Sequence, residues 1–309
     1  MNLKFAPVIV FAYNRQEHLQ TTIEALRRND GAKETICFIF SDGYKNETDK
    51  EKVLEVREYI HGLSTEYFKE IHIIEAKENK GLATSVIEGV SDVIRKYGQA
   101  IIVEDDVITA PCFLQFMNEA LKFYKEDSDV WSIGGYTVPM FLSEDYNKEV
   151  LAVQRCSSYC WATWSDRWES IDWAILDYPK FRFNIIQRMK FNKFGDDRAS
   201  MLDDQINGRV NSWAIRFDYN MWKKKMINIL PVKSLANNIG HDGSGTHSTV
   251  KDENDIFYVD LLTDLKKPRL SKVELNNDIR KEYIKFFPMA IESRVKRYFG
   301  NLFLTVKKK

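Results

Sequence analysis

Residues 100–107 read AIIVEDDV, a short apolar run that ends in three carboxylates. The apolar part, residues 100–103, is typical of a buried strand. Glu104, Asp105 and Asp106, called the carboxylate cluster below, repel one another, and their partial burial is unfavourable unless a cation neutralises them. Along an extended segment Glu104 and Asp106 share one side. Carboxylate oxygens suit Mg²⁺ or Mn²⁺, ions that commonly also hold substrate phosphates. The alternative interpretation is a solvated acidic turn.

Strand and helix patterns alternate on both sides of this stretch, through the first 135 residues. Apolar runs predict strands at residues 7–13, 35–40, 70–76, 100–103 and 130–134. Amphipathic periodicity predicts helices at residues 16–28, 50–60, 82–96 and 112–125. Such alternation predicts an α/β fold with a mostly parallel sheet that is covered by helices on both faces.

The pattern changes at about residue 136, where strands become fewer and tryptophans cluster. We therefore expect one part at residues 1–136, a smaller second lobe at residues 137–275 and a separate tail at residues 276–309. From residue 280 onward the tail carries nine Lys or Arg against two Glu, interleaved with aromatic and aliphatic side chains. This composition favours peripheral contact with an anionic membrane surface. The alternative is a C-terminal helix packed on the body.

The bulk composition excludes some classes of protein. The 309 residues include 45 Lys+Arg and 45 Asp+Glu, so the overall charge does not indicate a nucleic-acid partner. The sequence contains no apolar segment of ~20 residues and no signal-peptide pattern. We expect a cytoplasmic protein, with any membrane contact peripheral and at the inner face.

Polar residues follow several predicted strands, and in open α/β sheets ligands bind beyond the carboxyl ends of the strands. Arg15 can pair with a phosphate, and the small Ala12 lets the backbone approach a base or ribose. Asp42, after the second strand, can accept from a ring N–H. Lys80 and Gly81 precede a helix whose first amides suit an anion. Singly, Asp42 is more often a turn residue and Gly81 a helix start. No GxGxxG or P-loop motif occurs, which disfavours dinucleotide and P-loop sites.

Four motifs resemble the GT-A glycosyltransferases: PVIVFAYNR, the SDG after the second strand, NKGLATSVIEG, and VEDDV as the D-x-D-type element. The segment from VEDDV to the DSDVW that follows a predicted helix looks especially like the N-acetylglucosaminyltransferase I family. NIGHDGSGTHS is similar to bacterial sugar transferases from surface-polysaccharide loci. The resemblance implies a GT-A fold, with the nucleotide sugar held by residues 1–136 and the acceptor beside residues 137–275. It also implies a nucleotide-diphosphate sugar, usually UDP-linked, and Mn²⁺ or Mg²⁺.

The resemblance assigns roles to single residues. Asp106 would be the direct metal ligand, and His241 or His247 in the glycine-rich loop would complete the metal shell or contact the phosphates. The residues implied at the donor are Phe11, Ala12, Tyr13, Asn14, Arg15, Asp42, Lys80, Gly81, Glu104 and Asp105. The alternative for the loop is a surface segment with incidental histidines.

Two further roles belong to the acceptor side. An inverting transfer needs a base that takes the proton of the acceptor hydroxyl. Asp204, with Asp203 second, resembles the [ED]-D motif that opens a helix near the acceptor. The alternative is the ordinary preference of carboxylates for a helix N-terminus. Trp161 falls where the family places an acceptor-side wall and could stack on a sugar; the alternative is a core position between lobes.

The sequence favours a metal-dependent, inverting glycosyltransferase. It would move a sugar, GlcNAc first, from a UDP-sugar to a glycan or lipid-linked saccharide in surface-polysaccharide synthesis. One rival is a sugar-nucleotide nucleotidyltransferase, which is disfavoured because FAYNRQEH lacks the glycine-rich basic loop of that class. The other rival is a non-catalytic nucleotide-sugar-binding protein, against which the intact carboxylates argue.

Overall fold

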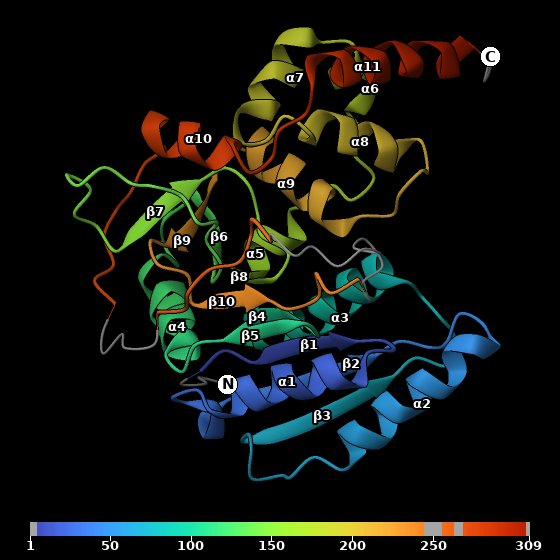
Figure 1. Cartoon of the computed structure of the whole chain (residues 1–309), viewed down its shortest axis with the longest axis vertical. Helices are drawn as coiled ribbons and strands as arrows, with labels where there is room; N and C mark the ends of the chain where they lie inside the picture. Colours follow the sequence, from blue (N-terminus) through green and yellow to red (C-terminus); the bar gives the residue numbers. More distant parts are fainter. Residues whose placement is uncertain (1–4, 244–254, 263–267, 307–309) are drawn as a thin grey trace.

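The computed structural model describes residues 5–243, 255–262 and 268–306, and the predicted site residue His247 lies outside them. One sheet of eight strands runs through the molecule in the order β3-β2-β1-β4-β8-β6-β9-β7. Helices flank this sheet, and further helices extend beyond it at one end (Figure 1). The predicted α/β fold with a mostly parallel sheet is confirmed, and the structure adds that the sheet is mixed.

The first half of the sheet is parallel. Its strands are β1 (Val8–Ala12), β2 (Ile36–Ser41), β3 (Glu70–Glu75) and β4 (Gln99–Glu104). The helices of this half are α1 (Gln16–Arg27), α2 (Glu47–His61), α3 (Leu82–Tyr97) and α4 (Phe113–Phe123), with a short 3₁₀ turn at Ala32–Glu34. β1 is apolar throughout because Val8 and Val10 enter the core on one face of the sheet while Ile9 and Phe11 enter the core on the other.

The second half of the sheet contains antiparallel strands. β8 (Cys160–Trp164) lies antiparallel between β4 and β6 (Val130–Gly134). β9 (Ile227–Pro231) runs parallel to β6, and β7 (Val150–Val153) closes the edge antiparallel to β9. The sheet therefore uses strands from both sides of the boundary predicted at residues 136/137. That boundary stays a prediction.

A second, two-stranded sheet lies at the end of β4. It pairs β5 (Val107–Thr109) antiparallel with β10 (Ala236–Asn238). β5 starts one residue after the carboxylate cluster. The pairing therefore brings the segment after β10 to the cluster, although the two are some 130 residues apart in sequence.

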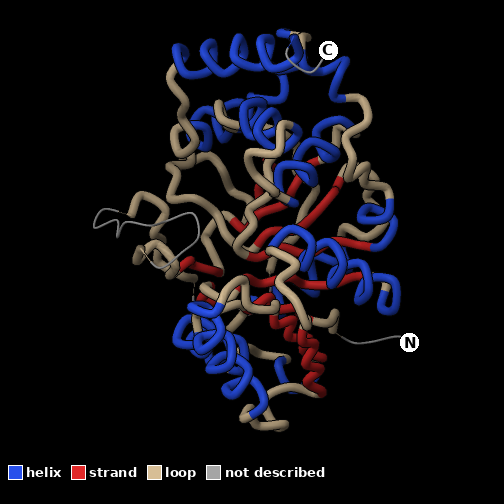
Figure 2. The backbone as a smooth tube through the Cα atoms, turned by 90° about the vertical axis from the view of Figure 1, so that its right-hand side faces the viewer, coloured by secondary structure: helices blue, strands red, loops and turns tan. Residues whose placement is uncertain are grey.

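Short helices form a layer beyond the second half of the sheet (Figure 2). They are α5 (Ser165–Glu169), α6 (Tyr178–Arg182), α7 (Ile185–Phe191), α8 (Arg198–Ile206) and α9 (Trp213–Lys223), with a 3₁₀ turn at Asn192–Phe194. Aromatic side chains join this layer to the sheet, since Trp161 on β8 stacks on Trp213 with ring centroids 4.8 Å apart.

The tail contains two helices, α10 (Asn277–Ile284) and α11 (Ile291–Val306). α10 buries Ile279 and Tyr283 in the main core, so this part of the tail is a packed helix. α11 lies across the outer end of the helical layer (Figures 1 and 2). No helix in the described residues is both long enough and apolar enough to cross a membrane.

Candidate functional site

The carboxylate cluster forms the turn between β4 and β5. Asp105 and Asp106 are each only 7% exposed. Thr22 on α1 holds the turn from the side: its hydroxyl donates to the Asp105 carbonyl over 2.8 Å and accepts from the Val107 amide over 3.0 Å. The strand end and the neighbouring helix therefore fix where the carboxylates lie. Sequence reasoning missed Thr22, because nothing in the pattern of α1 marks a threonine that faces another loop.

Negative charge in the cluster exceeds the positive charge beside it. Burial raises the pKa of the Glu104 carboxyl well above its ordinary value, and the neighbouring Asp106 and Asp105 raise it further. Burial also raises the pKa of Asp105 to about 6, although the nearby Arg15 opposes this shift. Three carboxyls thus face one guanidinium, an arrangement that a further cation would stabilise.

Both oxygens of Asp106 have partners. Arg15 donates to one of them over 2.8 Å and also contacts Asp105. Asn238, the last residue of β10, donates to the other oxygen over 2.8 Å. Arg15 was predicted at a phosphate, and in the structure it pairs with the cluster. Asn238 was not predicted as a site residue, although it is the first residue of the NIGHDGSGTHS motif.

The loop after β10 lies directly on the cluster. The Ile239 amide donates to the Asp106 carbonyl over 2.8 Å. A Cβ added at Gly240 would lie 2.1 Å from an Asp106 carboxylate oxygen. At this distance either the loop or the Asp106 side chain would have to move. Gly240 therefore permits the close approach of loop and carboxylate, which gives the glycine-rich motif a physical reason.

His241 continues this loop and joins a small network. Its Nδ1 lies 2.8 Å from Asp255, and its Nε2 lies 3.2 Å from the Tyr159 hydroxyl. The Tyr159 carbonyl accepts from the Glu104 amide over 3.0 Å. Of the two predicted histidines, His241 is therefore tied to the cluster through Tyr159.

A second group of predicted residues meets around Asp42, at the end of β2. The Asp42 carboxylate accepts from the amides of Lys80 and Gly81, both over 2.9 Å, and from the Asn79 side chain over 3.2 Å. Gly81 has a φ of +74° at the start of α3, a conformation that favours glycine. The Lys80 ammonium pairs with Glu88 at 2.7 Å. Asp42 therefore fixes the loop before α3.

The predicted residues at and just after the end of β1 lie between these two groups. The Tyr13 hydroxyl and the side-chain amide of Asn14 both donate to the Asp49 carboxylate, over 3.0 and 3.2 Å. Ala12 is buried, and Phe11 stacks on Phe40 with ring centroids 5.3 Å apart. Because β1, β2 and β4 are parallel neighbours, their carboxyl ends lie at one edge of the sheet, where α/β proteins bind ligands.

The structure does not bring Asp203 to this edge. Asp203 has no exposed surface, and it accepts from Arg188 over 2.9 and 2.6 Å and from the Tyr178 hydroxyl over 2.8 Å. A buried carboxylate held by these donors does not reach an acceptor hydroxyl. The prediction of Asp203 as a second choice for the base is therefore corrected: it ties together α6, α7 and α8.

Asp204 also has partners in the helical layer. Its carboxylate pairs with Arg209 and with Arg297 of α11, and its side chain is 16% exposed. None of its contacts in the described part of the chain is with the carboxylate cluster. The [ED]-D pattern was predicted to open a helix or to mark a helix N-terminus; this is corrected, because both aspartates lie in the last turn of α8, in the outer layer.

Trp161 is a core residue. It has no exposed surface, and its ring stacks on Trp213 and Trp168 with centroids 4.8 and 5.6 Å apart. A ring enclosed in this way does not form a wall for an acceptor sugar. The prediction of an acceptor contact is corrected, and the alternative of a core position is the one observed.

The side chains of the site show whether it suits the predicted Mg²⁺ or Mn²⁺ ion. Within the described residues, no group of three or more His, Cys, Asp or Glu side chains is arranged to hold a metal ion. The chemistry of the cluster nevertheless fits Mg²⁺ or Mn²⁺, because such ions often take one or two carboxylates from the protein and their other oxygens from phosphates and water. The donors suit a cation that arrives with a phosphate-bearing ligand better than a preformed cage.

Solved structures with weak similarity include the following three chains. The mannosyltransferase PcManGT from Pyrobaculum calidifontis, in complex with GDP-Man and Mn²⁺, is 16% identical over 52% of this chain and 44% of its own, with a TM-score of 0.35. Staphylococcus aureus TarS is 12% identical over 77% of this chain and 37% of its own, with a TM-score of 0.41. The TarS 1–349 structure gives the same identity and TM-score, over 61% of its length. The chain thus spans less than two thirds of each of these structures.

A comparison with curated proteins found no match. A comparison with family models matched residues 8–137 to the family described as glycosyl transferase family 2. The matched segment runs from β1 to just beyond β6 and includes Arg15, Asp42, the loop before α3 and the whole carboxylate cluster. The match covers less than half of the 309 residues, so the similarity to this family is confined to the amino-terminal part of the chain.

Proposed function

We propose that the chain is a metal-dependent glycosyltransferase that moves a sugar from a nucleotide-diphosphate sugar to an acceptor hydroxyl. The observation that carries the proposal is the carboxylate cluster at the end of β4, with Asn238 and Gly240 closed onto Asp106. The cluster lies inside the segment that matches glycosyl transferase family 2. An excess of buried carboxylates at the ligand-binding edge of a sheet has a use in binding a cation together with phosphates.

The contacts of the site support distinct roles for its residues. Asp42 holds the loop of Lys80 and Gly81 at the start of α3, where backbone amides suit a nucleotide. Arg15 pairs with the cluster, and its fork of donors matches a diphosphate equally well. Donor binding would therefore exchange the pairing of Arg15 with Asp106 for a pairing with phosphate.

The proposed cation is Mn²⁺ or Mg²⁺, with Asp106 as its protein ligand. When bound, such an ion supplies Lewis-acid stabilisation of the charge that develops on the departing nucleotide. Glu104 and Asp105 are then proposed to contact ribose and sugar hydroxyls. His241 is proposed to act beside them, because Tyr159 connects it to Glu104. His247 stays a proposal from the sequence.

The finer assignment is a UDP-sugar donor, with GlcNAc favoured, and a glycan or lipid-linked saccharide as acceptor in surface-polysaccharide synthesis. An inverting reaction is proposed, with Asp204 as the base. This role requires Asp204 to leave Arg209 and Arg297, with which it forms ion pairs. The partial exposure of its side chain makes such a release less costly than it would be for Asp203.

The proposal is tested by the melting temperature of the full chain with a panel of nucleotide sugars, each with and without Mn²⁺. A ligand at about a hundred times its Kd stabilises the native state by about 2.7 kcal/mol. We expect one UDP-sugar to raise the melting temperature in a manganese-dependent way. Asp106→Asn should abolish this rise, whereas the matched control Asp92→Asn, on the exposed face of α3, should keep it.

Release of the nucleotide from the stabilising donor then separates enzyme from binding protein. Release by the wild-type chain and none by Asp106→Asn would support transfer chemistry. Stabilisation without release under any acceptor condition would favour the non-catalytic binding protein. A melting temperature that no nucleotide sugar changes would contradict the proposal, since the cluster would not be a diphosphate and metal site.

A further inference from the structure

Exposed apolar side chains gather at one end of the molecule, on and beside α7 and α11. Nineteen large apolar side chains are exposed in the described residues, and seven of them lie in these two segments. They are Phe183, Ile185, Ile186, Met189, Ile291, Val295 and Phe299. Isolated exposed apolar residues are ordinary, but a group that two helices share marks an interaction surface. We call these seven residues the outer apolar surface.

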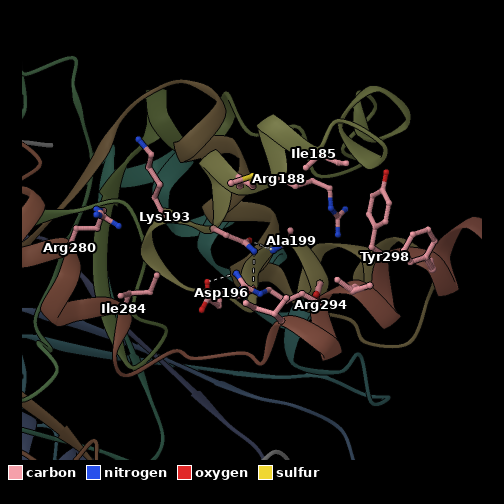
Figure 3. A pocket seen from close by; sticks show the side chains of 15 residues that line it. Ile185, Arg188, Lys193, Asp196, Ala199, Arg280, Ile284, Arg294 and Tyr298 are labelled. Carbon is pink, nitrogen blue, oxygen red and sulfur yellow. Dashed lines mark hydrogen bonds and ion pairs between the residues drawn. The ribbon is translucent and has the colours of Figure 1, made fainter.

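A cavity of about 560 Å³ opens between the helices that carry this surface (Figure 3). Ile185 and Met189 line it from α7, and Val295 and Phe299 line it from α11. The exposed apolar residues of α11, at positions 291, 295 and 299, are spaced by four residues and so form one stripe along the helix. The outer apolar surface therefore borders a groove between two helices, and charged side chains such as Arg188 and Asp196 also line this groove.

α11 is held in place by its polar face. Arg294 pairs with Asp196 at 2.7 Å, and Arg297 pairs with Asp204 of α8. The Arg188 guanidinium lies 5.3 Å from the centre of the Tyr298 ring. The helix thus turns its ionic contacts to the body, and its apolar stripe stays open. This arrangement is the reverse of what hydrophobic burial alone would give.

The same end of the molecule is strongly basic. Residues 178–195 contain five Lys or Arg and no Asp or Glu, in a chain whose formal net charge is zero. Four exposed lysines of this region make no ion pair within the described residues: Lys180, Lys190, Lys193 and Lys296. Four lysine charges on and beside α7 and α11 therefore have no ion-pair partner within the described residues, whereas arginines of this region do form ion pairs.

We propose that α7 and α11 together form a docking surface for an anionic phospholipid bilayer. The apolar side chains enter the interfacial region of the membrane, and the four lysines meet lipid phosphates. A second copy of the chain is a poor occupant, because it would place the same unpaired lysines opposite one another. The surface shares no residue with the donor site, so the proposal goes beyond the transfer reaction. Under the proposed function it would bring the enzyme to a lipid-linked acceptor.

Deletion of the tail is a poor test of this surface, because it would remove Tyr283 and Ile279 from the core. The test therefore uses exposed positions on α7. Sedimentation of the full chain with phosphatidylcholine vesicles that contain phosphatidylglycerol is compared between wild type and two double variants, Ile186→Asp with Met189→Asp and Lys190→Glu with Lys193→Glu. The matched control is Lys52→Glu with Leu54→Asp on α2, where both residues are also exposed.

We expect each α7 variant to lower the constant for partition of the protein onto anionic vesicles by about tenfold or more. Each lysine and each inserted apolar side chain contributes to this binding. The control should bind as wild type, and vesicles of phosphatidylcholine alone should bind weakly. Wild-type protein that ignores anionic vesicles, or α7 variants that bind unchanged, would overturn the proposal. So would concentration-dependent dimerisation of the wild type that the α7 variants lose, because it would assign the surface to a second copy.

The melting temperature of each variant, with and without a stabilising nucleotide sugar, keeps this test separate from that of the transfer reaction. Folded variants keep the wild-type melting temperature, so loss of vesicle binding reports on the surface. If no nucleotide sugar stabilises the wild type but vesicles still bind it, the proposed function fails and the docking surface stands. If a nucleotide sugar stabilises the wild type but vesicles do not bind it, only the proposal of the docking surface fails.

Discussion

Single side chains decide how the loop after β10 meets the carboxylate cluster. The sequence marks this loop as glycine-rich and implies, by resemblance, that one of its two histidines meets the metal or the phosphates. The structure adds that Asp106 is held between Arg15 and Asn238, and that the Gly240 backbone lies against the same carboxylate. An added Cβ would lie 2.1 Å from Asp106 and 3.0 Å from Arg15. Gly240 is therefore the position at which the smallest substitution should disturb the site.

Gly240→Ala should weaken nucleotide-sugar binding by about tenfold, because overpacking of this size costs about 1–3 kcal/mol. Asp106 or the loop must move to admit the methyl group, and either movement displaces a donor-site residue. The measurement is the concentration of nucleotide sugar that gives half of the melting-temperature rise. Gly62→Ala is the control, since a Cβ there would meet only ordinary contacts at 3.5 Å. Equal affinities in wild type and Gly240→Ala would show that the close approach is irrelevant to the donor.

Helices and strands were predictable where their pattern is local. The apolar runs up to residue 134 gave every strand of the parallel half, and α2 begins earlier than predicted only because Asn46 caps it through the Asp49 amide. β5 and β10 have three residues each, which is too short for a periodic pattern. β8 is inserted between β4 and β6 by long-range pairing. The site shows the same dependence on local pattern. Arg15 and Asp42 could be predicted as site residues because they follow strands, whereas the contacts of Thr22 and Asn238 depend on the tertiary fold.

The junction of β7, α8 and α10 supports a prediction about pH. Arg155 donates to Asp197 over 2.7 and 2.9 Å, and its guanidinium lies 3.8 Å from the centre of the Phe287 ring. Burial raises the pKa of the Asp197 carboxyl, but the charge and hydrogen bonds of Arg155 outweigh this, so its pKa is lowered overall. A carboxyl with a lowered pKa in the folded state stabilises the fold fully above its ordinary pKa of about 3.9, and this contribution declines as the pH falls below that value.

Asp197→Asn should therefore lower the free energy of unfolding by about 1–3 kcal/mol at neutral pH, where the ion pair is intact. The difference from wild type should shrink as the pH falls below about 4, because the wild-type carboxyl then becomes protonated. Urea denaturation of both proteins at a series of pH values measures the difference in unfolding free energy at neutral pH and how this difference changes with pH. A difference that stays constant across the series would mean that the ionised form of Asp197 contributes nothing.

The molecule as a whole separates two kinds of charge. Its net charge is zero, yet Asp105 and Asp106 lie buried after the end of β4, while unpaired lysines lie exposed on and beside α7 and α11. Exposed charges are screened by salt over about 8 Å at physiological ionic strength, whereas buried charges are screened much less. The two surfaces should therefore respond differently to salt.

Added sodium chloride should release the protein from anionic vesicles while the manganese-dependent rise in melting temperature with a nucleotide sugar changes little. The bound fraction and the melting temperature are measured in the same salt series on the full chain. The Lys190→Glu, Lys193→Glu variant should lose most of the salt dependence of vesicle binding, because fewer lysines then face the lipid phosphates. Vesicle binding that withstands salt would mean that the outer apolar surface acts without the lysines. The rise in melting temperature with a nucleotide sugar could instead fall in parallel with vesicle binding. That result would mean that the donor is bound by exposed charges, which would contradict a donor site at the buried Asp105 and Asp106.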